Sequence, residues 1–357
     1  MIVREITGNE DTLWNQLVND SSQGNAFTRA DCLQMLCATD PNLSLVRLGC
    51  FEGTRLVGGQ AIIYDTHWGF TLTPPFEFFY NGPLLAPMAR LSRASRAPMQ
   101  LDVLGSLAKA LAQRVDRLSF ETHPSLSDVR ALIELGWDVR PEYSHLWNVR
   151  DIQHVWNEMN RDKRRMIHQA NEKFVFGRDE SDDTLDAFLK LYHQTMEKFS
   201  WRPSPKWEAI FRARFRWLVE RDLCRLYIAR TIHGELAGGV VTLLSREDQS
   251  VYLYRQGSSV VFRDAGGVSA LYWHVAQQVA NEFSWVDFGG SPQPSLGRFK
   301  DFLGAQATLH FSVTHCNHPR RWQAYQLAQH YKDRTYNFLM RFAQRPIHWL
   351  LHKNYVH

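Results

Sequence analysis

The sequence predicts an α/β (α+β) protein in which one fold is used twice, each copy a mixed central sheet flanked by helices, followed by a basic C-terminal helix. Two observations lead to this prediction. A glycine-containing hairpin, Gly53-Thr-Arg-Leu-Val-Gly-Gly59, recurs as Gly234-Glu-Leu-Ala-Gly-Gly239, each time between two apolar runs. The predicted helices and strands also follow one another in the same order in the two halves, so both halves should fold alike.

A constant spacing supports the repeat. Phe120 and Phe288 are 168 residues apart, and so are the Leu-Gly pairs at 135/136 and 303/304. By this offset Lys300 corresponds to Leu132, so the first copy lacks the chemistry of a site. We therefore expect the second copy to hold the reacting centre and the first to serve as a scaffold or specificity surface. The predicted division is a first domain at residues 1–145, a second at 146–315 and a tail at 316–357.

Composition and length are those of a globular protein with a large core. Of 357 residues, 44% are apolar and 13% are aromatic, which is enough to bury a core in each of two domains. No run of 18 or more apolar residues occurs, so we expect no integral membrane segment. The N-terminus does not resemble a signal peptide, and we expect a cytoplasmic protein.

The net charge of +4 is unevenly distributed. Residues 320–357 hold seven Lys or Arg and one Asp, a net charge of +6, so the rest of the chain carries −2. Binding to a polyanion would therefore depend on this tail or on local clusters such as the basic residues at 161–165. For that cluster a solvated helix face and a phosphate contact both stay open, as does a peripheral membrane contact of the tail.

The five cysteines, at 32, 37, 50, 224 and 316, have no paired spacing. This pattern predicts neither a disulfide framework nor a structural zinc site. The segment His315-Cys316-Asn317-His318 has no second pair of ligands at a suitable spacing, so we expect no metal.

Local patterns predict each element of the first half. Apolar residues at helical spacing predict the helices, for which Asn9 and Ser127 are suitable N-cap residues and Gly136 a terminator. Two apolar runs joined by Glu52-Gly53-Thr54 predict a strand hairpin. The predicted strands are at 2–6, 43–51, 56–64, 76–80 and 118–121, and the helices at 9–18, 27–36, 99–115 and 127–135.

The second half is predicted in the same way. Gly266-Gly267 opens a helix, and Gly289-Gly290 follows a short buried strand. The predicted strands are at 223–231, 236–244, 251–257 and 285–288. The predicted helices are at 156–170, 182–199, 204–219 and 268–283, with a short one around 298–300 and a basic, aromatic one at 322–342.

The stretch from 285 to 304 joins strand, glycine loop and helix, which is typical of a binding site. Gly289, Gly290 and Ser291 would let a ligand approach the backbone, and amides there favour a developing oxyanion. Lys300 would add a cation. The alternative is an ordinary strand-to-helix turn with a solvated lysine.

Two further residues are candidates for proton transfer, Tyr254 and Asp287. For each a structural role is the alternative: Tyr254 as a buried sheet residue and Asp287 as a carboxylate that caps nearby amides. A Ser-His-Asp hydrolase is a poor fit, because the sequence has no GxSxG elbow.

Several short motifs occur in an informative order. They are Phe79-Tyr-Asn-Gly-Pro83, Trp156 with Arg165, Ile167 and Ala170, Leu191 to Thr195, Ala270-Leu-Tyr-Trp273, Asp287-Phe-Gly-Gly290 and Gly297-Arg-Phe-Lys-Asp-Phe-Leu-Gly304. In these motifs the chain resembles the Fem-type (FemAB-like) aminoacyltransferases and their relatives among the GNAT superfamily N-acyltransferases.

The resemblance implies two tandem GNAT-like domains and a transferase that moves an acyl or aminoacyl group from an activated donor to an amine. It places the family's Phe-Lys pair on Phe299 and Lys300, with the lysine stabilising charge at the donor ester. The expected substrate-binding residues are Gly289, Gly290, Ser291, Arg298, Phe299 and Arg255.

Two donors fit the resemblance, acyl-CoA and aminoacyl-tRNA. The coenzyme A motif of GNAT enzymes would fall on Arg263-Asp-Ala-Gly-Gly-Val268, from which Val268 departs. Gly266 and Gly267 nevertheless open a helix whose amides could hold a pyrophosphate, so Arg263 and these glycines are the expected donor-binding residues. A tRNA would need a broad basic surface, and the chain outside the tail carries −2.

We therefore slightly favour acyl-CoA as co-substrate, a small-molecule or peptide amine as acceptor, and no covalently bound cofactor. One alternative is Fem-type transfer from aminoacyl-tRNA to a peptidoglycan-like peptide amine. The other is a non-catalytic module that binds RNA or an anionic surface through the basic helix and the tail.

Overall fold

The computed structural model describes residues 1–327 except 68, 89–91, 200 and 292. It contains two compact units, Met1–His315 and Cys316–His357. In the second unit, residues 319–327 are helical, and the rest of the predicted tail helix lies outside the described residues. No helix of the described chain is long and apolar enough to cross a membrane.

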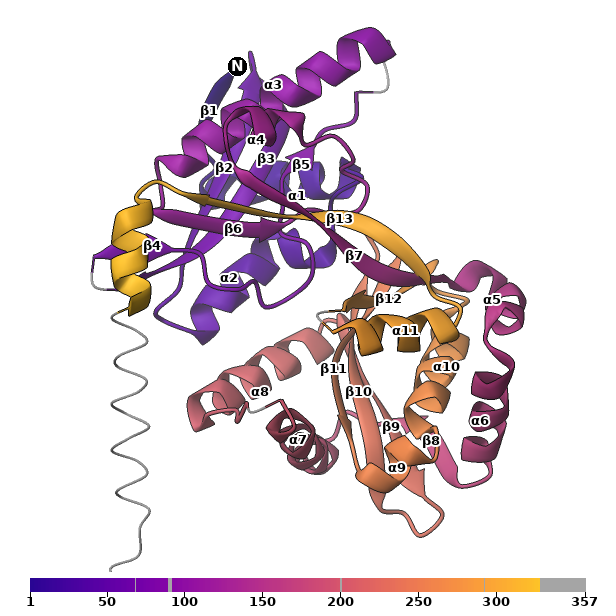
Figure 1. The fold of residues 1–357 in the computed structure, drawn as a ribbon. Coiled ribbons are helices and arrows are strands. Elements are labelled where there is room, and N and C mark those ends of the chain that lie inside the picture. The colour runs from indigo at the N-terminus through magenta and orange to yellow at the C-terminus, as the bar shows by residue number, and fades with distance from the viewer. Residues whose placement is uncertain (68, 89–91, 200, 292, 328–357) are drawn as a thin grey trace, which may run out of the picture. The chain divides into compact units, whose positions relative to one another are not determined.

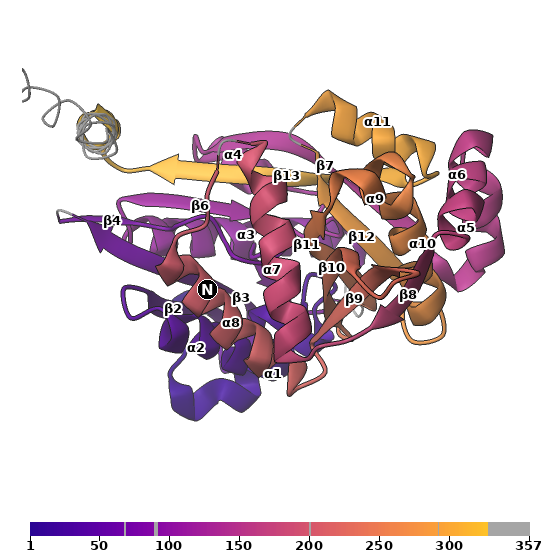
Figure 2. The ribbon, with the colours of Figure 1, turned by 90° about the horizontal axis from the view of Figure 1, so that it is seen from below.

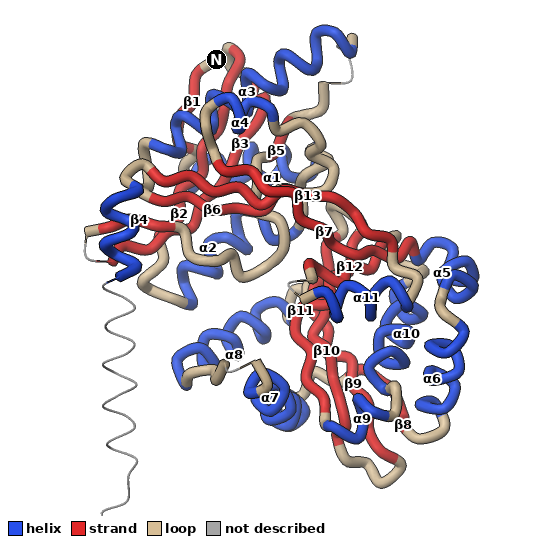
Figure 3. The backbone as a smooth tube through the Cα atoms, viewed as in Figure 1, coloured by secondary structure: helices blue, strands red, loops and turns tan. Residues whose placement is uncertain are grey.

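The first half of the large unit is a strand-rich layer with helices on both faces (Figures 1 and 3). Its strands are β1 (Ile2–Glu5), β2 (Ser44–Glu52), β3 (Arg55–His67), β4 (Phe70–Leu72), β5 (Leu84–Leu85), β6 (Arg117–Glu121) and β7 (Asp138–Asn148). Its helices are α1 (Asp11–Asp20), α2 (Ala30–Thr39), α3 (Arg93–Ala112) and α4 (Arg130–Glu134).

The second half repeats this order of elements, with helices again on both faces of the strands. Its strands are β8 (Phe174–Arg178), β9 (Cys224–Thr231), β10 (Leu236–Ser245), β11 (Ser250–Ser258), β12 (Trp285–Gly290) and β13 (Gln306–Cys316). Its helices are α5 (Ile152–Glu158), α6 (Arg161–Asn171), α7 (Asp182–Glu197), α8 (Pro205–Val219), α9 (Val260–Asp264), α10 (Gly267–Val279) and α11 (Pro294–Phe302).

Equivalent glycines end equivalent helices in the two halves. Gly136 follows α4 with φ +76°, and Gly304 follows α11 with φ +73°. In each case the residue after the glycine donates its backbone N–H across the turn, Trp137 to Leu132 O and Ala305 to Lys300 O. This left-handed helix end favours glycine, and it makes Leu132 and Lys300 structural counterparts, as the 168-residue offset predicts.

The two halves exchange their last strands. Sheet order runs β1-β2-β3-β4-β6-β13-β7-β12-β11-β10-β9-β8, so β13 of the second half lies between two strands of the first. β7 pairs antiparallel with β13 over Asp138–Leu146 and with β12 over Ser144–Asn148. Figure 2 shows β13 running from the second half into the first. Because of this exchange, each half completes the sheet of the other.

Packing also joins the halves. One apolar core belongs to the α3 and α4 face of the first half and another to the α6 and α10 face of the second. The remaining core combines residues of α1 and α2 with residues of α7 and α8, among them Trp14, Leu33, Phe188 and Phe211. The shared core and the exchanged strands explain why Met1–His315 forms one compact unit. The boundary at 145/146 stays a prediction.

Several elements differ from the sequence prediction, which did not include the strands β4, β5, β8 and β13. Residues 76–80 form no strand, because Phe78 and Phe79 pack on tyrosine rings of β11 instead. The helix expected at 156–170 is broken at Met159, and Asn160 caps α6 by accepting from the N–H of Asp162. β7 was not predicted, because much of the strand is exposed and polar and it contains Pro141, which lacks the N–H that a ladder needs.

Candidate active site

A cavity of about 610 Å³ lies beside the second part of β11. β11 and β12 are paired only over Ser250–Tyr252, and the cavity borders β11 from Tyr254 onward, where the two strands are no longer paired. Its other walls come from α6, α7, the start of α10 and α11. We call it the donor cavity. Five of the predicted site residues line it: Tyr254, Arg255, Arg263, Gly266 and Phe299.

The donor cavity combines cationic side chains with apolar walls. Lys163, Lys198, Arg255 and Arg263 line it, and no Asp or Glu occurs among the described residues of its lining. The Nζ of Lys163 lies 4.7 Å from the centroid of the Phe299 ring, and burial lowers the pKa of this lysine. A cavity of this kind suits a ligand with anionic and apolar parts.

The N-terminus of α10 opens at the donor cavity. Gly266 precedes the helix with φ +77°, and the first backbone bond runs from the N–H of Ala270 to Gly266 O. The preceding amides in this turn are therefore outside the helical ladder, where the helix dipole also favours an anion. Gly266, Val268 and Ser269 line the cavity, so a phosphate group could be held here.

Both glycines at this turn are also required by packing. A Cβ on Gly267 would lie 2.2 Å from an atom of the Phe262 ring, and a Cβ on Gly266 would lie 2.9 Å from Met166 Cβ. The pair therefore has a structural cause as well as the predicted ligand contact. Gly267 itself is buried and does not line the cavity.

Lys300 fastens the end of β12 to α11. Its side chain is 8% exposed, and its Nζ donates to Gly289 O and Gly290 O, each at 2.7 Å. Burial lowers the pKa of Lys300 to about 8, although nearby Asp287 opposes this shift. The alternative of a solvated lysine is wrong. Lys300 does not line the donor cavity, nor a second cavity of about 440 Å³ that Gly289 and Gly290 line.

The backbone of the glycine loop points differently from the prediction. The N–H of Gly289 donates to Asp287 Oδ1 at 2.7 Å, and the carbonyls of Gly289 and Gly290 accept from Lys300. The expected oxyanion contact of the Gly289 amide does not fit this arrangement, because that donor already has a buried partner. The positive φ of Gly289, +67°, turns the chain at this point.

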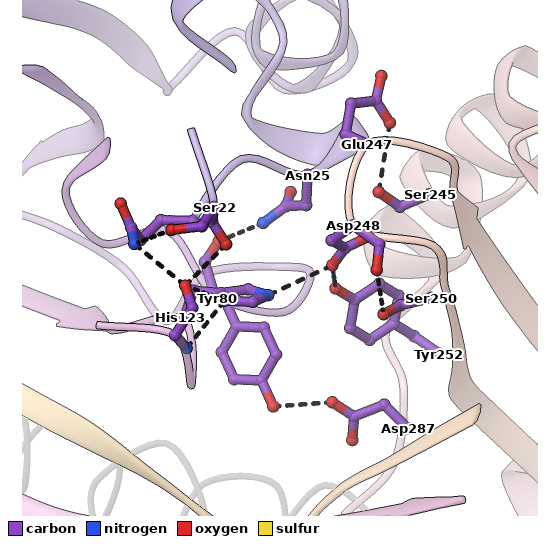
Figure 4. A network of polar contacts seen from close by, with 12 residues as sticks. Ser22, Asn25, Tyr80, His123, Ser245, Glu247, Asp248, Ser250, Tyr252 and Asp287 are labelled. Carbon is purple, nitrogen blue, oxygen red and sulfur yellow. Dashed lines mark hydrogen bonds and ion pairs between the residues drawn. The ribbon is translucent and has the colours of Figure 1, made fainter. Parts of the chain in front are cut away.

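Asp287 is a buried carboxylate that joins the two halves. It accepts hydrogen bonds from the Tyr80 hydroxyl at 2.7 Å (Figure 4) and from the Ser144 hydroxyl, both of them in the first half. Burial raises the pKa of Asp287, and these hydrogen bonds oppose the shift. Tyr80 lies in the loop before β5.

Tyr254 is held by a carboxylate that the sequence did not indicate. Its hydroxyl donates to Glu77 Oε1, while Glu77 Oε2 lies 3.2 Å from Arg214 Nη1 and the Arg255 guanidinium lies over the Tyr254 ring at 4.1 Å. Burial raises the pKa of Tyr254 well above its usual value, so its phenol stays protonated. Tyr254 can act as a hydrogen-bond donor or acid, and it is unsuited to be a base.

The other predicted residues border a second cavity or the surface. Gly289, Gly290 and Ser291 line a cavity of about 440 Å³, to which the first half contributes Glu121 and Glu142. Arg298 is exposed and lines neither cavity. The stretch recognised in the sequence thus separates two cavities: its strand end faces one and its helix faces the other.

Comparison with known proteins shows which folds the chain resembles. Residues 155–301 match the sequence model of the acetyltransferase (GNAT) domain. The structure of FemX is similar with a TM-score of 0.66 and 14% identity, covering 92% of this chain and 99% of that chain. No curated protein matches the sequence.

Two further solved structures are similar. The C-terminal domain of a putative lysylphosphatidylglycerol synthetase from Agrobacterium fabrum has a TM-score of 0.53 and 11% identity, covering 86% of this chain and 92% of that chain. A tandem GNAT protein from the clavulanic acid biosynthesis pathway has a TM-score of 0.51 and 11% identity, covering 88% and 98%.

These comparisons confirm the resemblance and the fold class predicted from the sequence, and the matched domain supports acyl transfer as the class of reaction. The chain has the tandem GNAT fold, and its residues 155–301 match the acetyltransferase (GNAT) domain model.

Proposed function

We propose that this protein is an N-acyltransferase that moves an acyl group from an activated donor, a coenzyme A thioester, to the amino group of a small molecule or peptide. The observation that carries the proposal is the donor cavity, where cationic side chains and a helix N-terminus meet apolar walls beside β11. Phosphates fit the first two features and an acyl chain the third.

Unpaired polar atoms at the donor cavity agree with such a ligand. Arg255 Nε and Gln256 Nε2 are buried and have no hydrogen-bond partner among the described residues, and both residues line the cavity. Both atoms carry only N–H groups, so they need acceptors. Each unmet group costs about 1–3 kcal/mol, and carbonyl or phosphate oxygens of a donor would remove that cost.

The charge distribution favours a small donor over a charged tRNA. A tRNA contact neutralises several phosphates over a wide surface, whereas residues 1–319 carry a net charge of −2. Within the basic cluster at 161–165 only Lys163 lines the cavity. Aminoacyl-tRNA is the rival donor, and a non-catalytic RNA-binding module is the rival function.

The reaction needs a neutral amine and an oxyanion stabiliser. The amine nitrogen attacks the donor carbonyl carbon, the C–N bond forms, and the tetrahedral oxyanion collapses with cleavage of the C–S bond. One amine proton leaves to a base, and the thiolate takes up a proton, so that an amide and a thiol are released. We assign the oxyanion to the N–H groups of Arg255, which lines the donor cavity. Lys300 donates to Gly289 O and Gly290 O, so it contributes through its charge and by holding the glycine loop, and Tyr254 protonates the thiolate.

Isothermal titration with coenzyme A tests the donor. Arg263→Ala should weaken binding about 10-fold or more, since a charge-assisted hydrogen bond contributes about 1.5–3 kcal/mol. Arg161→Ala is the matched control, because Arg161 is exposed and does not line the cavity; its affinity for coenzyme A should be unchanged.

The same titration distinguishes a coenzyme A donor from aminoacyl-tRNA and from a non-catalytic RNA-binding module. Mixed charged tRNA is added at low and at physiological salt. If coenzyme A gives no heat while charged tRNA binds with a steep salt dependence, the small-donor proposal is wrong. RNA binding of that kind without any acyl transfer would favour the non-catalytic module.

A further inference from the structure

A second cavity, of about 440 Å³, is built from both halves of the large unit. The first half contributes the rings of Phe78, Phe79 and Tyr80, with Glu121 at the end of β6 and Glu142 on β7. The second half contributes the end of β12 and His310 of the exchanged strand β13. We call it the acidic cavity, because two carboxylates and no Lys or Arg occur among the described residues that line it.

The two cavities have opposite hydrogen-bonding character. The unpaired buried groups at the donor cavity are N–H donors, Arg255 Nε and Gln256 Nε2. At the acidic cavity the buried atoms without a hydrogen-bond partner among the described residues include Ser291 Oγ and the carboxylate oxygen Glu121 Oε2, whose one near cationic neighbour is His310 at 3.4 Å; both oxygens can accept. A ligand of the acidic cavity should therefore bring N–H donors and positive charge.

His310 lies beside Glu121 in this cavity. Its side chain is 8% exposed, and its Nε2 is 3.4 Å from Glu121 Oε2. Its Nδ1 is buried with no hydrogen-bond partner among the described residues. The Tyr80 ring packs edge-on against it at 5.4 Å, and Glu142 is its partner across the β7/β13 pair. A carboxylate next to a histidine stabilises the imidazolium that forms when the ring accepts a proton.

We propose that the acidic cavity is the acceptor site and binds a primary ammonium group, with Glu121 and Glu142 supplying the charge complement and His310 accepting the proton. This inference rests on the proposed acyl transfer. Aromatic rings at the cavity suit a cation as well. Gly289, Gly290 and Ser291 line the acidic cavity, and Phe299 of α11 lines the donor cavity, so neighbouring parts of one chain segment border the proposed acceptor and donor sites.

The proton balance follows directly. The ammonium R–NH₃⁺ gives one proton to His310 and becomes a nucleophilic amine. Its nitrogen forms the new C–N bond, its second proton leaves as the amide forms, and the leaving thiolate is protonated. His310 then returns its proton to solvent.

Direct binding of amines tests the site without the donor. The probes are 1,4-diaminobutane, Nα-acetyl-lysinamide and glucosamine, each titrated into the full chain beside a neutral hydroxyl analogue. At least one amine should bind, and its hydroxyl analogue should not. Glu121→Gln should weaken that amine at least 10-fold, and Ser291→Ala by a smaller factor. Glu134→Gln, which removes an equal charge from an exposed position on α4, should leave it unchanged.

Activity tests the role of His310. With acetyl-CoA and the best amine probe, His310→Asn should lower kcat about 100-fold, a usual contribution of a general base, while the Kd for coenzyme A stays within twofold. Failure of every amine to bind the wild type, or equal affinity in Glu121→Gln, overturns the acceptor site. If the wild type does not bind coenzyme A while the amines bind as expected, the proposed coenzyme A donor is wrong and the acceptor site stands.

Discussion

Replacing Lys300 by Met removes a buried cation and two hydrogen bonds while keeping a side chain of similar length. Lys300 donates to Gly289 O and Gly290 O, both at 2.7 Å. Leaving two buried carbonyls unpaired costs about 1–3 kcal/mol each. Removing the ammonium offsets part of this loss, because the charged form is costly to bury. The pKa of Lys300 falls from 10.5 to about 8 on folding, which corresponds to a cost of about 3 kcal/mol for burying the charge. Near pH 7 the net loss should be about 1 kcal/mol.

The stability difference should depend on pH, and its sign follows from the lowered pKa. Between pH 8 and 10.5 the unfolded chain holds the Lys300 proton and the folded chain does not. Wild type therefore gains stability relative to the variant as pH rises through this window. From pH 7 to pH 9.5 the difference should grow by about 2 kcal/mol, at 1.36 kcal/mol for each pH unit above 8.

Denaturant unfolding at several pH values measures this difference, and acyl transfer measures the role of the charge. The neutral amine keeps N–H donors for both carbonyls, so a fall of wild-type kcat above about pH 8 would report loss of the cation rather than loss of the loop. The variant should be about 100-fold slower at pH 7. A stability difference that is constant with pH refutes the buried ammonium. A variant kcat equal to that of wild type would show that Lys300 takes no part in catalysis.

The other variants test the packing around the site, each by denaturant unfolding beside turnover. Leu132→Met, at the counterpart of Lys300 in the first half, should cost less than about 1.5 kcal/mol and leave kcat unchanged; a slower enzyme would contradict the assignment of the reacting centre to the second half. Gly267→Ala should destabilise by about 1–3 kcal/mol, because its Cβ would meet the Phe262 ring at 2.2 Å; unchanged stability would show that the ring moves freely. Tyr254→Phe removes the hydroxyl that donates to Glu77, which keeps Arg214 and Arg255 as partners. It should lower kcat more than it changes the Kd for coenzyme A, whereas equal loss in both would make Tyr254 a binding residue.

Much of the fold could be predicted because its signals are local. The hairpin glycines, the apolar runs of β2, β3, β9 and β10, and the glycine that ends α4 and α11 are each encoded within a few residues. β7 could not be predicted in this way. It becomes a strand through its partners β12 and β13, which are more than 130 residues away.

The same distinction applies to the site. The stretch 285–304 was recognisable because strand, glycine loop and helix adjoin in sequence. The partners of its side chains were not, since Tyr80 is 207 residues from Asp287 and Glu77 is 177 residues from Tyr254. His310 lies beside Glu121 only because β13 crosses into the first half. No local sequence pattern predicts that crossing.

The most direct measurement follows both products of one reaction. The full chain is incubated with acetyl-CoA and a mixture of primary amines, free thiol is measured by a chromogenic reagent, and acetylated amines are detected by mass spectrometry. The account predicts one thiol for each amide formed, with formation of both slowed about 10-fold or more by Arg263→Ala at limiting donor. Release of thiol without any amide, or no release while aminoacyl-tRNA supports transfer to the same amines, would contradict it.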